Sequence, residues 1–195
     1  MHIRIALIAA LIGPMAPAFA TQDAPPPVQG TDLSGLHSFD ARVGCWTGKN
    51  HVLKERLAGS HEWMDYPSKQ HHWLVMGGYG NVTENWYDKP GGAYHLLTVR
   101  TYDAKTGQWN IWGFDSRYPS DNVDPPTRGR FDSSSGVGTF YSDDTLRGKP
   151  VRVRFTWSSV STTQAHWEQA YSPDGGKTWE TNWVADFQKA ACDTL

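Results

Sequence analysis

The chain has no excess of one charge that could indicate a nucleic-acid partner. Of its 195 residues, 18 are Lys or Arg and 20 are Asp or Glu, which gives a formal net charge of −2. The basic residues form no stripe along the sequence. Nucleic-acid binding needs such a basic footprint, because much of its affinity comes from neutralised phosphates. The charge pattern therefore argues against a nucleic-acid partner.

The chain also lacks an apolar run that could span a bilayer. The run Ile5–Ile12 is much shorter than the roughly 20 residues that a membrane helix needs. It follows a short basic start and precedes Ala18-Phe19-Ala20, a small-x-small cleavage site, which is the arrangement of a secretory signal peptide. We predict that residues 1–20 are a signal peptide cleaved after Ala20 and that residues 21–32 form a flexible, Pro-rich leader. The expected product is exported, to the periplasm or beyond the cell.

No segment shows sustained helical periodicity, whereas Gly (19), Pro (12) and aromatic residues (13%, with ten Trp) are frequent. Aromatic residues favour strands. Period-two alternation and turn signals mark eleven candidate strands, namely Cys45–Leu57, His61–Tyr66, His71–Met76, Gly80–Tyr87, Ala93–Tyr102, Gln108–Ser116, Arg128–Asp132, Val137–Ser142, Val151–Ser158, Gln164–Ser172 and Thr178–Phe187. Because antiparallel closure needs an even number of strands, one of the short early runs is not separate. Residues 33–195 thus predict one all-β domain, an up-and-down antiparallel β-barrel of about ten strands after a short helical turn.

Gly44-Cys45-Trp46 opens the first predicted strand, directly after the possible helical turn. This resembles the G-x-W signature of lipocalins, in which the Trp plugs the closed end of the barrel. A barrel end needs a bulky side chain, and the adjacent Gly permits a close approach of the chain. The motif favours a lipocalin-like fold and says nothing about a ligand.

The sequence has only two cysteines, Cys45 at the start of the first strand and Cys192 after the last. In a barrel closed by antiparallel pairing, these two points lie side by side. Exported proteins meet an oxidising compartment, so we predict a disulfide between them. The alternative is a pair of free thiols, one of them on a frayed tail.

Ser172–Trp179 fits the Asp-box pattern S-x-D-x-G-x-T-W, which recurs in sialidase-like propellers. There is one copy, and the chain is too short for several four-stranded blades. We therefore interpret the motif as a well-formed hairpin between the last two strands rather than as a sign of glycosidase activity.

The sequence lacks metal-binding and nucleophile motifs. The mature chain has seven His: His37, His51, His61, His71, His72, His95 and His166. None stands in an H-x-H, HExxH or Cys/His cluster, and the adjacent pair would point to opposite faces of a strand. We predict no metal site and no cofactor. His51 and Glu84 are the acid–base candidates, but nothing in their spacing pairs them, so catalysis is the less favoured reading.

Polar residues embedded among the Trp-rich strands suggest a small-molecule pocket. Five Trp would form its walls, namely Trp46, Trp63, Trp112, Trp167 and Trp183. Five polar residues would orient a ligand by hydrogen bonds, namely Asn50, Asn81, Arg100, Gln169 and Asn182. Arg100 would favour a carboxylate or another anionic group. The alternative is that these polar groups satisfy one another or face solvent.

Several short motifs resemble a bacterial lipocalin-like family described as a domain of unknown function, number 1579. They are His61-Glu62-Trp63, Gly80-Asn81-Val82, Val99-Arg100, Gln108-Trp109, Gly129-Arg130-Phe131, Val153-Arg154-Phe155 and the run Trp167–Trp183. The similarity extends from about Phe39 to Phe187. It implies a calycin-type barrel in a bacterial protein and brings no activity, ligand or catalytic residue.

Three hypotheses follow. In the first, the exported barrel binds a small, partly apolar molecule in its lumen, and Arg100 would favour an anionic one. In the second, it is an enzyme acting on a small molecule in the same cavity, with His51 or Glu84 as acid–base group. In the third, it is a structural or interaction module with a filled interior. The sequence leaves the oligomeric state open.

Overall fold

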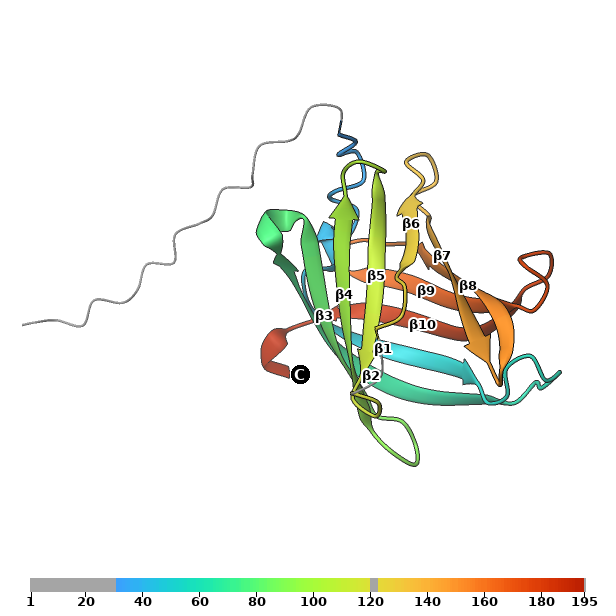
Figure 1. Cartoon of the computed structure of the whole chain (residues 1–195). Helices are drawn as coiled ribbons and strands as arrows, with labels where there is room; N and C mark the ends of the chain where they lie inside the picture. The colour runs from blue at the N-terminus through green and yellow to red at the C-terminus, as the bar shows by residue number, and fades with distance from the viewer. Residues whose placement is uncertain (1–30, 120–122, 195) are drawn as a thin grey trace, which may run out of the picture.

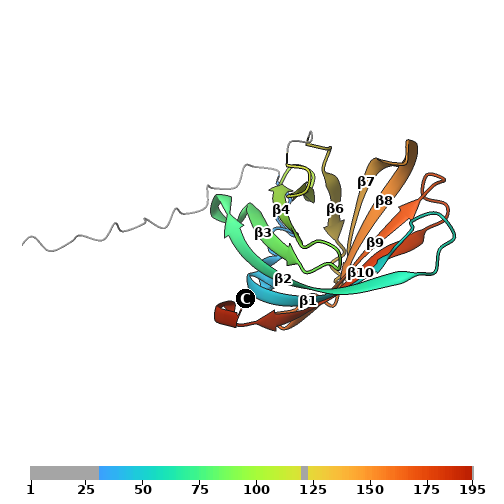
Figure 2. The same cartoon turned by 90° about the horizontal axis from the view of Figure 1, so that it is seen from below.

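In the computed structural model, which describes residues 31–119 and 123–194, the chain forms one closed antiparallel barrel (Figures 1 and 2). Each strand pairs with its neighbour in sequence, and β1 pairs with β10 to close the ring. The strands are β1 Gly44–Leu53, β2 Trp63–Val75, β3 Gly80–Tyr87, β4 Tyr94–Asp103, β5 Gln108–Asp115, β6 Thr127–Phe131, β7 Gly138–Leu146, β8 Lys149–Ser158, β9 Gln164–Ser172 and β10 Glu180–Ala190. The predicted up-and-down, all-β barrel is confirmed. The predicted signal peptide and residues 21–30 of the leader lie outside the described residues.

The strand count is ten because two predicted segments are one. His61–Tyr66 and His71–Met76 belong to the single long strand β2. This strand pairs with β1 from Leu53↔Trp63 to Gly44↔His72, and its second half also pairs with β3. The even number that closure requires is reached in this way.

A short segment before β1 covers one end of the barrel. Its last turn is the 3₁₀ helix η1, Asp40–Arg42, and the fully buried Phe39 just before it inserts among core aromatic rings. The Phe39 ring lies edge-on to the rings of Trp109 and Phe131, with centroids 5.2 and 5.1 Å away. The predicted helical turn is therefore present as a 3₁₀ turn, and its aromatic residue helps to fill the closed end.

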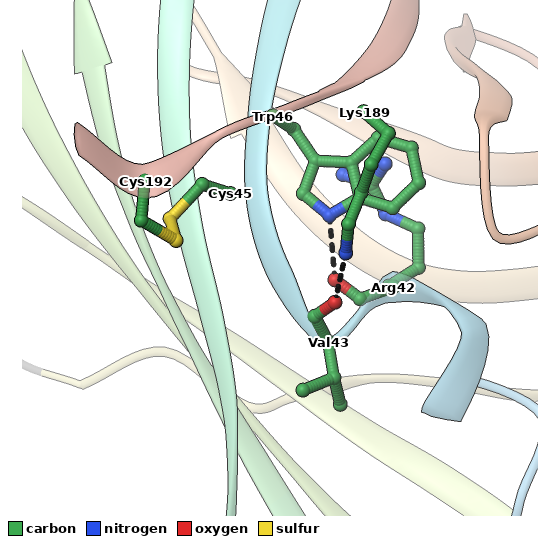
Figure 3. The surroundings of a disulfide bond; sticks show 6 residues. All are labelled: Arg42, Val43, Cys45, Trp46, Lys189 and Cys192. Atoms are coloured by element: carbon green, nitrogen blue, oxygen red, sulfur yellow. Dashed lines mark hydrogen bonds between the residues drawn. A yellow bond between two sulfur atoms is a disulfide. The ribbon is translucent and has the colours of Figure 1, made fainter. Parts of the chain in front are cut away.

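Trp46 plugs this closed end, as the G-x-W motif predicts. The side chain has no exposed surface, and its Nε1 donates a hydrogen bond to the carbonyl oxygen of Arg42 at 2.6 Å. The guanidinium of Arg42 lies 4.1 Å and the ammonium of Lys189 4.8 Å from the indole ring centroids, and Figure 3 shows these side chains against the ring. Lys189 also donates to the carbonyl oxygen of Val43, which ties β10 to the chain just before β1.

The disulfide Cys45–Cys192 is present beside this plug (Figure 3). It joins the start of β1 to η3, Cys192–Thr194, directly after β10, so it reinforces the pairing that closes the ring. The bridged cysteines are 147 residues apart in sequence. The helices of the described residues are 3₁₀ turns of three residues each. Besides η1 and η3 they include η2, Met76–Gly78, which connects β2 to β3. None of these helices is long or apolar enough to cross a membrane.

Replacing both cysteines by Ala should lower the free energy of unfolding by about 4–5 kcal/mol. In the chain-entropy model the loss grows with the length of the closed loop, here 147 residues. Urea unfolding of Cys45→Ala/Cys192→Ala against the oxidised wild type measures the difference, with dithiol-reduced wild type as the control. A loss of unfolding free energy below about 1 kcal/mol would contradict the prediction that the disulfide stabilises the closed barrel.

Candidate functional site

The barrel encloses a cavity of about 250 Å³ with two unlike walls. On β2–β4 the wall is largely polar and contains Gln70, Asn85, Thr98 and Arg100. On β8–β10 it is aromatic, formed by Phe155, Trp157, Trp167, Tyr171 and Trp183. Val123, Asp124 and Pro125, from the connection between β5 and β6, also line the cavity.

The polar wall arises because β3 reverses the usual pattern of a barrel strand. Its buried positions are Asn81, Thr83, Asn85 and Tyr87, whereas Val82, Glu84 and Trp86 alternate with them and are only partly buried. Apolar residues normally occupy the inward positions of such a strand. A strand that places amides and hydroxyls inside instead gives the lumen hydrogen-bonding groups.

Arg100, on β4, is the cationic side chain among the described residues that line the cavity. Its Nη1 donates to Asn81 Oδ1 at 3.1 Å and to Thr83 Oγ1 at 2.8 Å, while its Nε is buried without a hydrogen-bond partner. The guanidinium carbon lies 4.9 Å from the Phe39 ring centroid. Burial lowers the pKa of Arg100 to about 10, so the group stays protonated at neutral pH. Within the described residues, no carboxylate forms an ion pair with it.

A second buried guanidinium, that of Arg42, lies behind the polar wall. Its Nη2 donates to Gln70 Oε1, Gln70 Nε2 donates to Asn85 Oδ1 at 2.6 Å, and Asn85 Nδ2 donates to the carbonyl oxygen of Leu96 at 2.7 Å. Arg42 Nε and Nη1 are buried without partners. Burial and the charge of Arg100 lower the pKa of Arg42 to about 9. Two cations thus stand near each other at the closed end, with no salt-bridge partner among the described side chains.

His72 completes this polar cluster as a neutral group. It is 1% exposed, and its Nδ1 lies 3.1 Å from Thr83 Oγ1. Burial, followed by the charges of Arg100 and Arg42, lowers its pKa to about 2. Because the Thr83 oxygen accepts from Arg100, its hydroxyl hydrogen can be donated to His72.

The aromatic wall is a packed set of rings with two hydrogen-bonded side-chain pairs beside it. Trp167 has ring centroids 5.2 Å from Phe155 and 5.4 Å from Trp183. Trp183 Nε1 donates to Asn50 Oδ1 at 3.1 Å, which satisfies the indole N–H. In the second pair, Gln169 Nε2 donates to Asn182 Oδ1 at 2.8 Å, and Asn182 occupies the register shift of β10. Such a wall presents ring faces and edges to a ligand with few unsatisfied donors.

The structure brings six of the ten predicted ligand-binding residues to the cavity: Asn50, Arg100, Trp112, Trp167, Gln169 and Trp183. Asn81 and Asn182 are fully buried behind it and hold Arg100 and Gln169 by the hydrogen bonds given above. Trp46 is fully buried in the closed end and is not a cavity wall.

Three sequence predictions fall on the outer face. Trp63 was expected to be a lumen wall, but its ring stacks on His51 at 4.2 Å, and His51 binds Asp65 at 2.6 Å among exposed side chains. Glu84 is also partly exposed and faces His95 at 3.8 Å. The reason is parity: in β2 the buried side chains begin at Tyr66 and continue at every second residue, and Trp63 has the opposite phase. His51 and Glu84 therefore do not line the cavity.

Sequence reasoning missed five residues of the polar cluster: Arg42, Gln70, His72, Thr83 and Asn85. In β2 and β3 a signal was available, because uncharged polar residues recur at every second position in phase with a buried Tyr, while Asp65, Lys69 and Glu84 have the opposite phase. For Arg42 there was none, since its burial depends on how the 3₁₀ turn folds over the barrel end.

Comparisons with known proteins establish the fold and no family. No family model matches the chain, and no curated protein matches it in sequence. Among solved structures, the barrel is similar to the S-type phycobiliprotein lyase CPES from Guillardia theta, with a TM-score of 0.53 and 8% sequence identity. The match covers 78% of this chain and 90% of that one. At this identity the likeness supports a lipocalin-like fold alone.

The depressed pKa of His72 should make the protein less stable in acid. The unfolded chain binds a proton at this residue below pH 6.5 while the folded chain stays neutral down to about pH 2, so stability falls as pH drops between these values. Going from pH 7.5 to 4.5 should cost about 2.5 kcal/mol through this group. Urea unfolding of His72→Gln should lack that part of the pH dependence, and the exposed neighbour variant His71→Gln should retain it. Equal pH profiles for wild type and His72→Gln would refute the assignment.

Proposed function

We propose that this protein is an exported, lipocalin-like barrel that binds a small, partly apolar molecule in its lumen. The observation that carries the proposal is the cavity of about 250 Å³ with one polar and one aromatic wall. Small-molecule sites are mostly apolar and hold a few placed polar groups that orient the ligand. The two walls of this lumen supply both parts, so a ligand with an aromatic or aliphatic body and one polar edge fits it.

The cavity also discriminates among the three hypotheses. A filled structural module would leave no space beyond a few waters, whereas this cavity is several times the roughly 30 Å³ of one water molecule. The enzyme hypothesis needs His51 or Glu84 as an acid–base group inside the barrel, but both residues lie on its outer face. Ligand binding is the function that the geometry supports best.

The size of the cavity favours a compact ligand. Pockets for drug-sized molecules typically measure about 300–1,000 Å³, and this one lies just below that range. The similarity to a phycobiliprotein lyase, at 8% identity, supports the barrel fold of the proposal and does not bear on the ligand. We also propose that the chain is exported and that it belongs to the family of unknown function 1579. The disulfide fits export, and the quoted motifs support the family.

Filling the lumen should abolish binding, whereas the same change on the outer face should not. Thr98 lines the cavity and Thr101, on the same strand, has the opposite phase. Titration calorimetry with 2-naphthoate and its neutral analogue 2-naphthalenemethanol should show saturable one-to-one binding of at least one probe. Thr98→Phe should weaken it at least tenfold, and Thr101→Phe should leave it within about twofold, since a phenyl ring occupies much of the available space.

Two results would count against the proposed function. The first is that the wild type binds neither probe. The second is that Thr98→Phe, shown to be folded by its melting curve, binds as the wild type does.

A further inference from the structure

Among the described residues, no carboxylate forms an ion pair with either of the two buried arginines of the closed end, and this bears on the class of ligand. Arg42 and Arg100 are 1% and 6% exposed, and both guanidinium groups lie near the same ring, with carbons 5.3 and 5.8 Å from Trp157 ring centroids. A buried charge is normally paired or bound by an ion, since its desolvation costs several kcal/mol. Here aromatic faces and neutral oxygens take the place of a carboxylate.

The hydrogen bonds of Arg100 orient its guanidinium. Nη1 is held by Asn81 and Thr83, both from β3. Nε has no hydrogen-bond partner within the part of the chain that the structure describes, and it shares with Nη2 the other edge of the planar group. Two parallel N–H bonds along one edge match the two oxygens of a carboxylate. Of the two buried arginines, Arg100 is the one that lines the cavity, so a ligand in the lumen lies against its side chain.

The other charges around Arg100 favour an anion at the closed end of the cavity. Arg42 adds a second positive charge behind the wall. It donates a hydrogen bond to Gln70, which in turn donates to Asn85, and both of these residues line the cavity. His72 stays neutral and contributes no third charge. The carboxylates that line the cavity belong to exposed residues, namely Asp124, Asp143 and Asp144. None of them forms an ion pair with either arginine.

We infer that the ligand is an organic monocarboxylate, bound with its carboxylate on the Nε–Nη2 edge of Arg100 and its apolar body against the aromatic wall of β8–β10. This assignment rests on the proposed function and names the chemical class of the ligand for the same site. A carboxylate fits better than a phosphate dianion, because one guanidinium edge offers two donors and the polar residues Asn85 and Thr98, which line the same wall of the cavity, are neutral.

The experiment compares probes that differ only in their polar group: 2-naphthoate, 2-naphthalenemethanol and 2-naphthyl phosphate. Calorimetry with the full mature chain should show that naphthoate binds about 10–100-fold more tightly than the alcohol, which is the range for a hydrogen bond to a charged group. Arg100→Met should bring the two affinities within about twofold of each other. Arg128→Met, an exposed arginine of β6, should keep the full preference.

A second variant covers the case in which Arg100→Met does not fold. Arg100→Lys keeps the charge but loses the two-donor edge, so it should retain only part of the preference for naphthoate over the alcohol. Melting curves report whether each variant is folded.

The outcomes distinguish a failure of the proposed binding function from a failure of the carboxylate assignment. If no probe binds, the proposed function fails. Binding of the alcohol as tightly as naphthoate by the wild type would overturn the carboxylate assignment and leave the function standing. The same holds if folded Arg100→Met keeps the preference, or if the phosphate binds more tightly than naphthoate.

Discussion

The pairing of β1 with β10 is the contact on which the rest of the structure depends. It turns a ten-stranded meander into a ring, and only in a closed ring does each strand have a fixed inside and outside. The bridge between Cys45 and Cys192 and the contact of Lys189 with Val43 both act at this seam. Without the seam the polar side chains of β2–β4 would face solvent, and Arg100 would be an ordinary exposed cation.

The fold could be predicted from sequence because alternation is a local property and closure follows from it. The disulfide was predictable for the same reason, since it follows from which strand ends meet. The plugging role of Trp46 was predicted from the resemblance of Gly44-Cys45-Trp46 to the lipocalin G-x-W signature. The site was harder, because it depends on the phase of each strand. Trp63 was assigned to the lumen by its residue type, but Asp65 and Lys69 share its phase and mark that face as the outer one.

The polar wall illustrates why apolar patterning alone misplaces such a site. In β3 the apolar Val82 and Trp86 lie on the less buried face, while Asn81 and Asn85 are buried. A rule that sends apolar residues inward inverts this strand. The burial of Arg42 is a tertiary property, because it depends on a 3₁₀ turn folding over a barrel end that the same segment helps to close. Nothing in its own neighbourhood in the sequence encodes that.

The energetics of the closed end connect the fold with the proposed ligand. Apolar side chains of similar volume in place of buried charges are often neutral or stabilising, so stability alone does not account for two guanidinium groups without carboxylates. Rings beside Arg42 and Arg100 offset part of the desolvation cost through cation–π contacts, and a disulfide closing 147 residues stabilises the whole ring against it. Within the described residues, Arg42 Nε and Nη1 and Arg100 Nε remain without hydrogen-bond partners, and of these two arginines Arg100 is the one that lines the cavity. A ligand carboxylate on the Nε–Nη2 edge of Arg100 would pair the charge and add stability to the folded state in proportion to its own binding. Folding and ligand recognition would then depend on the same buried arginine.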